Sequence, residues 1–599
     1  MRKFLAPLLL LGLLQHGSSA LAAHAFSLYD TPKYPAGFSH FEYVNPNAPR
    51  GGELYLANPD RRTSFDKFNP FSMKGVSAAG VANLMFETLA TQSADEVATM
   101  YGLLAEDMEL APDRMSMTFR LHPNARFNNG DPVTAEDVKH SFDTLIKFGA
   151  PQFKLLYSDV ERCVVVDERT VRFDFKELNR ELPLIVGGTP VFSKKWGANT
   201  TFDRIQLEAP IATGPYLIER YDTGRSITFR RNPDYWGNDI AVRRGMFNFE
   251  RIVYRFYKDD VARLEAFKAG EFDMVVENSA KNWARAYVGR QFDNGEIVKR
   301  ELEHSNGAGM QGFIMNTRRP QFQDVRVRQA LAYALDYEWM NRQLFYKQYT
   351  RIYSYFNNSE MAAKGLPSEA ELKLLEPLRE QLDPVVFGPA PVPPNTDPPG
   401  SLRANLLKAR ELFREAGWEY RDGALRNKAG QPFTFEIMDD QGAMSRVVSV
   451  YVRNLRILGV DVRQRTADFT LVQKRMQDFD FDMTSVRFPD TTSPGNEMFD
   501  MFGSQAADET GSSNYWGLKD PAVDKLVSTL VNAETRADLV AAARALDRVL
   551  LHKHLVVTHW YSSTHRVAYR NRFGMPDKPP LYYTADPYVI STWWQVKPR

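Results

Sequence analysis

Polar and apolar side chains alternate at 118–121, as in a strand, and a helix-like pattern follows from 134. At 118–121 the sequence TFRL alternates strictly, as a half-buried strand does. The following NNGDP at 128–132 is typical of a turn in which Gly130 takes a positive φ and Pro132 fixes the exit. Thr134 is placed to cap a helix, with Glu136 and Asp137 in a first turn that favours acidic groups. The pattern predicts a strand, a glycine turn and a capped helix.

Helical and strand periods recur through the first half of the chain. Apolar residues at 78–89 have helical spacing, and two apolar runs at 164–166 and 171–175 flank a polar turn, which predicts a hairpin. We therefore expect a mixed α+β insert over 71–192. A helix over 260–270 leads into a strand at 272–276, and Asp324 caps an apolar-striped helix. The segment 24–49 is rich in Tyr, Phe, Pro and Asn with weak periodicity, which indicates an extension wrapped over the surface.

A second set of elements follows a proline-rich stretch. Residues 374–399, which end in PAPVPPNTDPP, favour an extended surface segment. The helix predicted at 402–416 stops at Gly417, a residue suited to the position after a helix. Beyond it we expect a hairpin strand at 433–438, a helix at 444–458 and a strand at 460–465. These elements predict a second α/β lobe with its own core.

The N-terminus has the pattern of a secretory signal peptide. Arg2 and Lys3 precede an apolar run at 4–14 that is too short to span a bilayer, and a cleavage pattern ends at Ala22, with Ala25 as a second possible site. We expect residues 1–22 to be removed and the protein to work in the periplasm. The single cysteine, Cys163, lies far from this site, which argues against a lipid anchor.

Composition excludes several classes of protein. One cysteine in 599 residues leaves no disulfide framework and no thiolate metal cluster, and Cys163 in a strand-like run is expected to be a small buried apolar residue. The formal charge is +1, and loss of the two leader cations would bring it to −1. That balance gives no support to a nucleic-acid or anionic-membrane partner. Aromatic residues make up 12% of the chain, which suits a cleft lined with rings.

Several segments together resemble the family 5 extracellular solute-binding proteins of bacterial ABC importers. The resemblance is spread from about 52 to 570 along the chain and rests on the order of its motifs. These are TFRLHPNARFNNGDPVTAEDVKHS from Thr118, ATGPY from Ala212, FRRNPDYWG from Phe229, AFKAGEFD from Ala266 and FIMNT from Phe313.

The resemblance implies an α/β protein of two lobes with a hinge and an inserted third subdomain, similar to the class C binding proteins. We assign 23–70, 193–300 and 560–599 to lobe I, 71–192 to the inserted subdomain and 301–559 to lobe II. It also implies a binding protein rather than an enzyme, with no cofactor. Its partners would be a peptide ligand and the inner-membrane permease subunits with their cytoplasmic ATPase. We expect a monomer.

A narrower resemblance points to the YejA-type branch of the family. It rests on YVNPNAPRGG from Tyr43, on NPF from Asn69 and on SYFNNSE from Ser354. The branch is associated with uptake of oligopeptides and the antibiotic microcin C, and some relatives take murein peptides. These ligands are what the resemblance implies for this chain.

Candidate ligand-binding residues come from the same resemblance and from charge. A closed cleft must neutralise a peptide amine, because an unpaired buried charge costs several kcal/mol. Asp490 resembles the aspartate that pairs with the ligand's ammonium in peptide-binding relatives; a turn-initiating role is its alternative. Arg487 could clamp a carboxylate or phosphate, or be solvated. Tyr515 and Trp516 could stack on ligand side chains or pack in the core. On the other lobe, Asn58, Arg61 and Arg62 are placed at the cleft rim.

Two other functions stay open at this point. The chain contains no GxSxG, HExxH, P-loop or GxGxxG motif, so a secreted peptide or murein hydrolase would need a nucleophile and base that the sequence does not show. A nickel or haem receptor on the same fold would favour His552, His554 or His559 in the cleft, with His565 nearby. In an extended segment, however, His552 and His554 would point to opposite faces, and carboxylates at ligand spacing are missing.

Overall fold

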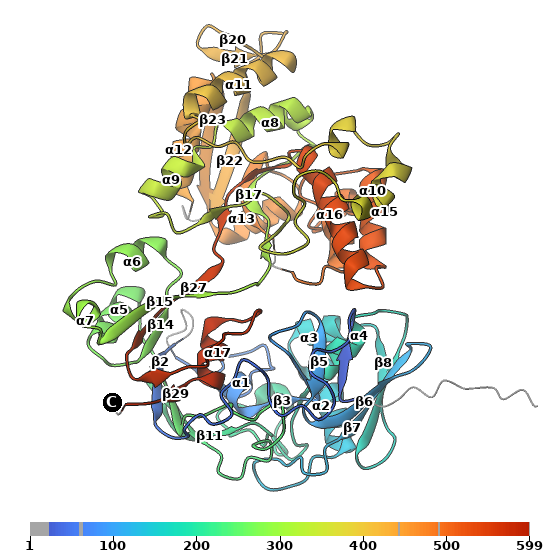
Figure 1. The fold of residues 1–599 in the computed structure, drawn as a ribbon, viewed down its shortest axis with the longest axis vertical. Helices are drawn as coiled ribbons and strands as arrows, with labels where there is room; N and C mark the ends of the chain where they lie inside the picture. The colour runs from blue at the N-terminus through green and yellow to red at the C-terminus, as the bar shows by residue number, and fades with distance from the viewer. Residues whose placement is uncertain (1–22, 59–63, 441–443, 489–490, 598–599) are drawn as a thin grey trace, which may run out of the picture.

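The computed structural model describes residues 23–58, 64–440, 444–488 and 491–597. The expected leader at 1–22, with its cleavage site at Ala22, lies outside these ranges. Figure 1 shows two lobes, one above the other, and we call them the lower and the upper lobe in that view. None of the helices in the described ranges is both long and apolar enough to cross a membrane.

The lower lobe is built on a seven-stranded mixed sheet that collects strands from distant parts of the chain. Its central strand β2 runs parallel to both neighbours, β13 and β14, and the other pairings are antiparallel. The order across the sheet is β11 (Tyr216–Asp222), β12 (Ser226–Arg231), β13 (Arg251–Arg255), β2 (Glu53–Ala57), β14 (Met274–Val276), β27 (Thr564–Arg570) and β15 (Ile297–Glu303).

A four-stranded antiparallel sheet forms the predicted insert in the same lobe. Its order is β6 (Ala105–Leu110), β7 (Ser116–Leu121), β9 (Thr170–Phe175) and β8 (Val160–Val165), and α2 (Ala135–Phe148) packs against it. The predicted strand, turn and capped helix are confirmed. Gly130 has φ 86°, and Thr134 and Asp137 form a reciprocal capping box. Cys163 is buried as expected, and burial raises the pKa of its thiol to about 12.

Two predictions in this lobe were wrong. The helix expected over 78–89 is only α1 (Val81–Met85), because Gly80 has a left-handed φ of 83° and Phe86 is extended, and strand β3 (Glu87–Thr88) follows. The extension at 24–49 is not a surface wrap. It contributes β1 (Ala25–Ser27) to a three-stranded sheet with β5 (Thr99–Gly102) and β4 (Ala90–Gln92). Its rings also build a small core, in which Phe41 and Tyr43 stack at 5.1 Å.

The upper lobe is built on a five-stranded sheet drawn from one continuous stretch of chain. Its order is β23 (Asp461–Ala467), β22 (Thr434–Asp440), β24 (Met483–Arg487), β17 (Gln311–Met315) and β25 (Val556–Thr558). The strand expected at 433–438 exists but is not part of a hairpin. It is β22, which runs parallel to β23 and β24, because a helix connects it to β23.

Helices cover the upper sheet and form a bundle beside it (Figure 1). The predicted cap at Asp324 and the stop at Gly417, whose φ is 86°, are confirmed. These helices are α8 (Val325–Tyr333), α9 (Tyr337–Gln343), α10 (Glu369–Leu375), α11 (Leu402–Glu415), α12 (Ser445–Ile457), α13 (Phe469–Gln477), α14 (Glu497–Phe502), α15 (Pro521–Val531) and α16 (Arg536–His552).

Two chain crossings connect the lobes. The first runs from β15 of the lower sheet through β16 (Ala308–Gly309) to β17 of the upper sheet. The second returns from β25 through β26 (Trp560–Tyr561) to β27. His304 N donates to Ser563 O at 3.1 Å, so the crossings are hydrogen-bonded to each other. Two short adjacent connections of this kind form a hinge between rigid bodies.

Candidate ligand-binding cleft

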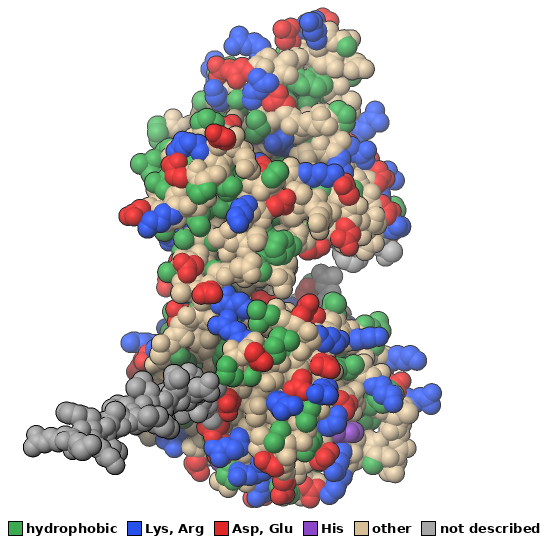
Figure 2. All heavy atoms as spheres, turned by 90° about the vertical axis from the view of Figure 1, so that its right-hand side faces the viewer, with side chains coloured by type: hydrophobic (Ala, Val, Ile, Leu, Met, Phe, Trp, Pro, Cys, Tyr) green, Lys and Arg blue, Asp and Glu red, His purple; other side chains and the backbone are tan. Residues whose placement is uncertain are grey.

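Three cavities run together along the junction of the lobes. The lower cavity, of about 550 Å³, borders α17 (Ala585–Thr592), and the tyrosine cavity, of about 630 Å³, is lined by four tyrosines that include Tyr582 and Tyr583. The hinge cavity, of about 580 Å³, lies at the chain crossings. Asn83 lines the first two, and Glu277 lines the lower and hinge cavities. Because they share walls, the three form one cleft, and Figure 2 shows a notch between the lobes.

The charged side chains that line the lower cavity are mainly acidic. Asp260, Glu277 and Asp586 line it together with a single arginine, Arg263. Glu277 is held in place because its carboxylate accepts from Ser279 N at 2.6 Å and from the Tyr287 hydroxyl at 3.0 Å. Burial raises the pKa of Asp586. A cation bound beside this carboxyl group would favour its charged form.

Two arginines line the hinge cavity, which shares Glu277 with the lower cavity. These are Arg487 and Arg566, and Arg566 donates from Nη1 to Gln348 Oε1 at 2.8 Å. His304 and His565 lie with their ring centroids 4.4 Å apart in the same wall. Burial lowers the pKa of His565, so it is neutral near pH 7. The cleft is therefore polarised, with an acidic end and a basic end.

The motif SYFNNSE joins the hinge to the helical bundle of the upper lobe. Asn358, at φ 55°, donates from Nδ2 to His304 O at 3.1 Å and to Asn306 O at 2.9 Å. Ser354 Oγ donates at 2.7 Å to the buried carboxylate of Asp547 in α16. The motif therefore fixes the first chain crossing against a long helix, a role that sequence alone did not reveal.

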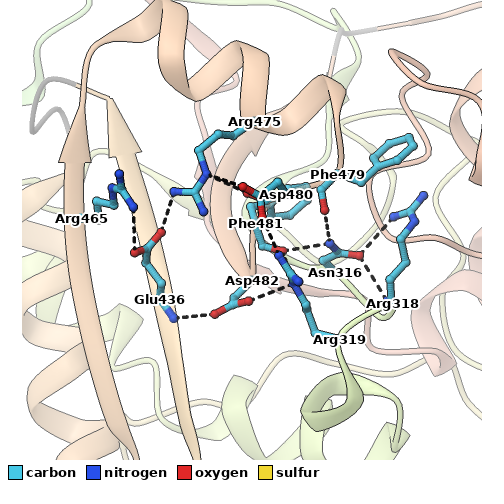
Figure 3. A network of polar contacts seen from close by, with 10 residues as sticks. All are labelled: Asn316, Arg318, Arg319, Glu436, Arg465, Arg475, Phe479, Asp480, Phe481 and Asp482. Carbon is cyan, nitrogen blue, oxygen red and sulfur yellow. Dashed lines mark hydrogen bonds and ion pairs between the residues drawn. The ribbon is translucent and has the colours of Figure 1, made fainter.

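A polar network fixes the segment that enters β24, the strand that ends at Arg487 (Figure 3). Asn316 donates from Nδ2 to the carbonyls of Phe479 and Phe481, each at 2.9 Å. Arg319 pairs with Asp480 at 3.0 Å, and the Asp482 carboxylate accepts from Glu436 N at 2.9 Å. These contacts hold the segment that leads into β24 in place.

The predicted site residues have different places. Asp490 and Arg61, with Arg62, lie outside the described residues. Asn58 lines the lower cavity, where it is buried and its Oδ1 accepts from Tyr257 N at 3.0 Å. Arg487 is exposed at the end of β24 and lines the hinge cavity. The structure therefore brings Asn58 and Arg487 to opposite sides of one cleft.

The two predicted aromatic residues lie elsewhere. Trp516 is fully buried in the upper core, stacked against Phe502 at 5.3 Å and Phe488 at 5.0 Å. Tyr515 packs half-buried against the same core. Neither residue lines any of the three cleft cavities. The NYWG turn therefore contributes to packing of the upper lobe. Core packing was the alternative to ligand stacking that the sequence left open for these two residues.

The histidine group does not gather in the cleft. His552 and His554 line a separate cavity of the upper lobe, and His559 is fully buried against Phe313 and Trp560. The segment is not extended, because α16 continues through His552 and His554 has φ 48°, and both histidines line the same cavity. No cluster of three metal-ligating side chains occurs among the described residues.

Most residues that line the cleft were missed by sequence reasoning. Glu277 and Asn278 follow directly on β14, and Arg566 lies in β27. The first two carried a usable signal, since polar residues directly after a predicted strand lie at the strand's carboxyl end, where ligands often bind. Arg566 and Asp586 carried none, because the fold brings them to the cleft from the last forty residues of the sequence.

Away from the hinge, the lobes also touch directly. Arg180, before α4 (Leu182–Gly187), donates from Nη2 to Glu534 O of the upper lobe at 3.2 Å. Glu181 lies against the upper lobe so closely that a Cβ on Gly495 would be 2.5 Å from its Oε1. We call this group of contacts the latch. With both hinge and latch formed, the structure shows the lobes in contact on two sides of the cleft.

The sequence matches a known protein family over most of its length. Residues 99–510 match the bacterial extracellular solute-binding proteins, family 5. The chain is similar to the probable peptide-binding protein YejA of Agrobacterium fabrum, with 40% identity over 576 residues, 94% of this chain and 92% of that protein. It is also similar to the peptidoglycan-binding protein YepA of the same organism, with 35% identity over 606 residues and 97% of each chain.

A solved structure supports the fold. The oligopeptide-binding protein AppA of Bacillus subtilis, solved in complex with a nonapeptide, superposes with a TM-score of 0.61. The match covers 92% of this chain and all of that one, at 19% identity. At this identity the likeness establishes the two-lobed fold.

Proposed function

Because the chain belongs to the family 5 bacterial extracellular solute-binding proteins, we propose that it captures peptides in the cleft between its lobes and delivers them to a membrane permease. The observation that carries the peptide proposal is the polarity of the cleft. Asp260 and Asp586 lie at one end, Arg487 and Arg566 lie at the other, and Glu277 lines the cavities of both ends. A peptide is a dipolar ligand, and its two termini match these two ends.

Side-chain tolerance is consistent with the size of the cleft. Cavities of several hundred Å³ that open into one another leave room for side chains of different volume. The names of the relatives point to the same ligand class, since one is a probable peptide-binding protein and another a peptidoglycan-binding protein. Murein peptides, and peptide-like antibiotics such as microcin C, therefore belong to the proposed range of ligands.

We retain Asp490 as the proposed anchor of the ligand's ammonium group. The residue that follows it, Thr491, lies against the hinge, where a Cβ on Gly307 would be 2.7 Å from Thr491 O. Gly307 lines both the tyrosine cavity and the hinge cavity. Thr491 thus lies at the cleft wall, which supports a binding role for this part of the sequence.

The setting of the protein follows from the family. We propose that the leader at 1–22 directs the chain to the periplasm, where it acts as a monomer. The inner-membrane permease and its cytoplasmic ATPase would receive the ligand. We further propose the division into lobe I (23–70, 193–300 and 560–599), an inserted subdomain (71–192) and lobe II (301–559). The family is one of binding proteins, and we propose no catalytic step.

The first experiment is native mass spectrometry of the protein purified from periplasm without refolding. A ladder of short peptides, or murein peptides that contain diaminopimelate, released on denaturation would support the proposal. A carried metal complex, with no peptide and no peptide binding by calorimetry, would refute it.

A second experiment locates the two ends of the ligand. A peptide recovered from the protein is compared with its N-acetylated and its C-amidated forms by calorimetry, using wild type, Asp490→Asn and Arg487→Gln. We expect Asp490→Asn to abolish the preference for the free amine and Arg487→Gln the preference for the free carboxylate. Asp461→Asn, an exposed position on β23, is the matched control. Unchanged preferences in both variants would remove these residues from the site.

A further inference from the structure

The upper lobe contains a fourth cavity, of about 470 Å³, that shares no lining residue with the three cavities of the cleft. We call it the upper cavity. Its walls come from α8, from β18 (Thr350–Arg351) and from the end of α16, and the segment 391–394 between α10 and α11 forms part of its rim. Its volume is in the range of sites for small organic molecules.

The upper cavity lies back to back with the hinge cavity. Arg351 lines the upper cavity, and its neighbour Ile352 lines the hinge cavity. Likewise, Met310 lines the upper cavity and its neighbour Gln311 lines the hinge cavity. Successive residues of an extended segment point to opposite faces, so the same two segments form a wall of each cavity. Only the thickness of these extended segments separates the two cavities.

A half-buried arginine, Arg351, lines the upper cavity, and part of its guanidinium is unpaired within the described chain. Arg351 Nε donates to Thr558 Oγ1 at 3.2 Å, and the guanidinium lies 5.0 Å from the centre of the Tyr337 ring. Its Nη1 is buried, and no hydrogen-bond partner for it occurs among the described residues. Burial lowers the pKa of Arg351 to about 10, which still leaves it charged near neutral pH. A buried N–H group of a cation is costly to leave unpaired, unless a ligand or another group accepts a hydrogen bond from it.

No carboxylate of the described chain forms an ion pair with Arg351. Asp383 lines the same cavity, but it is exposed and its Oδ1 accepts from Val385 N at 3.1 Å. Glu338 is the nearest acid that influences Arg351, and its Oε2 accepts from the backbone and the hydroxyl of Thr396. The positive charge of Arg351 is therefore not compensated by a contacting acid.

His552 is a second side chain of this cavity with a nitrogen that is unpaired among the described residues. His552 also lines the upper cavity, and its Nε2 is buried with no hydrogen-bond partner in the part of the chain that is described. Burial and the charge of Arg548 lower the pKa of His552, so its imidazole is neutral near pH 7. A neutral imidazole can donate one hydrogen bond. The cavity thus offers one cation and one neutral donor.

Apolar side chains form much of the remaining lining. Val325, Val385, Pro391 and Val392 line the cavity, and the Val392 side chain at its rim is 83% exposed. An exposed apolar side chain at an entrance provides a surface for an apolar ligand body. We propose that the upper cavity binds a small organic carboxylate, whose carboxylate pairs with Arg351 and whose apolar body lies among the valines and prolines.

The charge of the site favours a monoanion over inorganic phosphate. One guanidinium and one neutral imidazole can neutralise a carboxylate, whereas a phosphate dianion would bring a second charge among apolar side chains without a partner. A carboxylate can also accept two parallel hydrogen bonds from a planar guanidinium such as that of Arg351.

The test uses the full-length mature protein and ligand-observed ¹⁹F NMR with 4-fluorobenzoate. 4-Fluorobenzamide and 4-fluorobenzylamine keep the ring and change the charge, and inorganic phosphate is added as a competitor. We expect 4-fluorobenzoate to bind at least about tenfold more tightly than either analogue, as loss of a charge-assisted hydrogen bond implies. A saturating peptide should not displace it, which separates this site from the cleft. Displacement by the peptide, equal binding of the amide, or displacement by phosphate at equal concentration would overturn the proposal.

Two variants test the residues. Arg351→Met should lose at least about tenfold in affinity for 4-fluorobenzoate, and Arg403→Met, on the exposed face of α11, should lose none. Ala332→Phe leaves Arg351 intact and fills the cavity from α8, so it should also abolish binding. Circular dichroism shows whether each variant is folded. Retained binding in either folded variant of the cavity would overturn the assignment.

Discussion

Tyr29 and Ser493 share a hydrogen bond of 2.7 Å between their hydroxyl oxygens, although 464 positions separate them in the sequence. Tyr29 follows β1 in the lower lobe, and its ring packs against the core of the upper lobe. Arg180, which contacts Glu534 O, lies 5.4 Å from the centre of the Tyr29 ring. Tyr29 therefore belongs to the latch and connects the lobes at the side where α4 faces α16 (Figure 1).

Replacing Tyr29 by Phe should weaken closure of the cleft. The change removes one hydrogen bond between the lobes, worth about 1 kcal/mol, and keeps the ring in place. Because closure and ligand binding are coupled, peptide affinity should fall about fivefold. Calorimetry measures the affinity, and small-angle scattering of the ligand-free protein measures the mean separation of the lobes. Tyr420→Phe, at an exposed position of the upper lobe, is the control and should change neither.

The latch should also respond to pH through Glu181. Burial, and to a smaller extent repulsion by Glu497, raises the pKa of Glu181 above its usual value. Opening would return this carboxyl to water, so the closed form binds more protons than the open form. Closure is therefore favoured at low pH and weakens as pH rises through the raised pKa.

Glu181→Gln tests this dependence. A neutral amide neither titrates nor repels Glu497, so the variant should stay closed at high pH and lose most of the pH dependence. Fluorescence energy transfer between labels on the two lobes, recorded from about pH 4 to about pH 8, measures closure. The same profile in the variant and the wild type would show that Glu181 does not govern the latch.

Removing the Asn358 side chain should loosen the hinge. Asn358→Gly retains the positive φ of 55° without strain but removes both hydrogen bonds to the first chain crossing. We expect faster amide exchange at 304–309 and a several-fold loss of ligand affinity. Asp422→Gly places a glycine at another position with positive φ, 51°, far from the hinge, and controls for added backbone freedom. Equal exchange rates in the two variants would contradict a role for the Asn358 amide.

Asp547 should make the upper lobe less stable as pH rises. Burial raises the pKa of Asp547 to about 7, well above its value of about 3.9 in an unfolded chain. The folded form therefore holds a proton that the unfolded form has released. This stabilising contribution is full below about pH 4 and is lost as pH rises through about 7.

Urea denaturation followed by tryptophan fluorescence at several pH values measures this effect. Asp547→Asn should be less stable than the wild type below about pH 4, by about 1–3 kcal/mol, because its NH₂ replaces an acceptor of Ser354, Tyr355 or Ala363. It should also lack the loss of stability between about pH 4 and pH 7. Asp461→Asn, which is exposed, should follow the wild type. A variant with the wild-type slope would assign the pH dependence to other groups.

Local signals in the sequence predicted the elements well where a cap or glycine defined them. Thr134, Asp324 and Gly417 each mark a helix boundary that the structure confirms. The errors have a common cause, which is tertiary context. β22 follows a turn and looks like one arm of a hairpin, but the crossover through α12 makes it parallel to β23. A glycine in the left-handed region at Gly80 shortened a helix that periodicity alone extended.

The candidate site was harder to predict than the fold. Arg487 and Asn58 do line the cleft, but most of its acidic and basic groups come from short segments that sequence gives no reason to join. Glu277, Arg566 and Asp586 meet only because β27 lies beside β14 and α17 follows it. Trp516 shows the converse, since an aromatic turn that suits ligand stacking also suits a core.

The position of β27 between β14 and β15 sets an order for folding during synthesis. The upper sheet draws on 311–558, so that lobe can close on itself before the last forty residues are made. The lower sheet cannot, because β14 must wait nearly three hundred residues, and β2 about five hundred, for β27, the strand that joins them to β15. Until then an open strand edge is exposed, which is an aggregation hazard. The part of the molecule that is synthesised first is thus the part that is completed last.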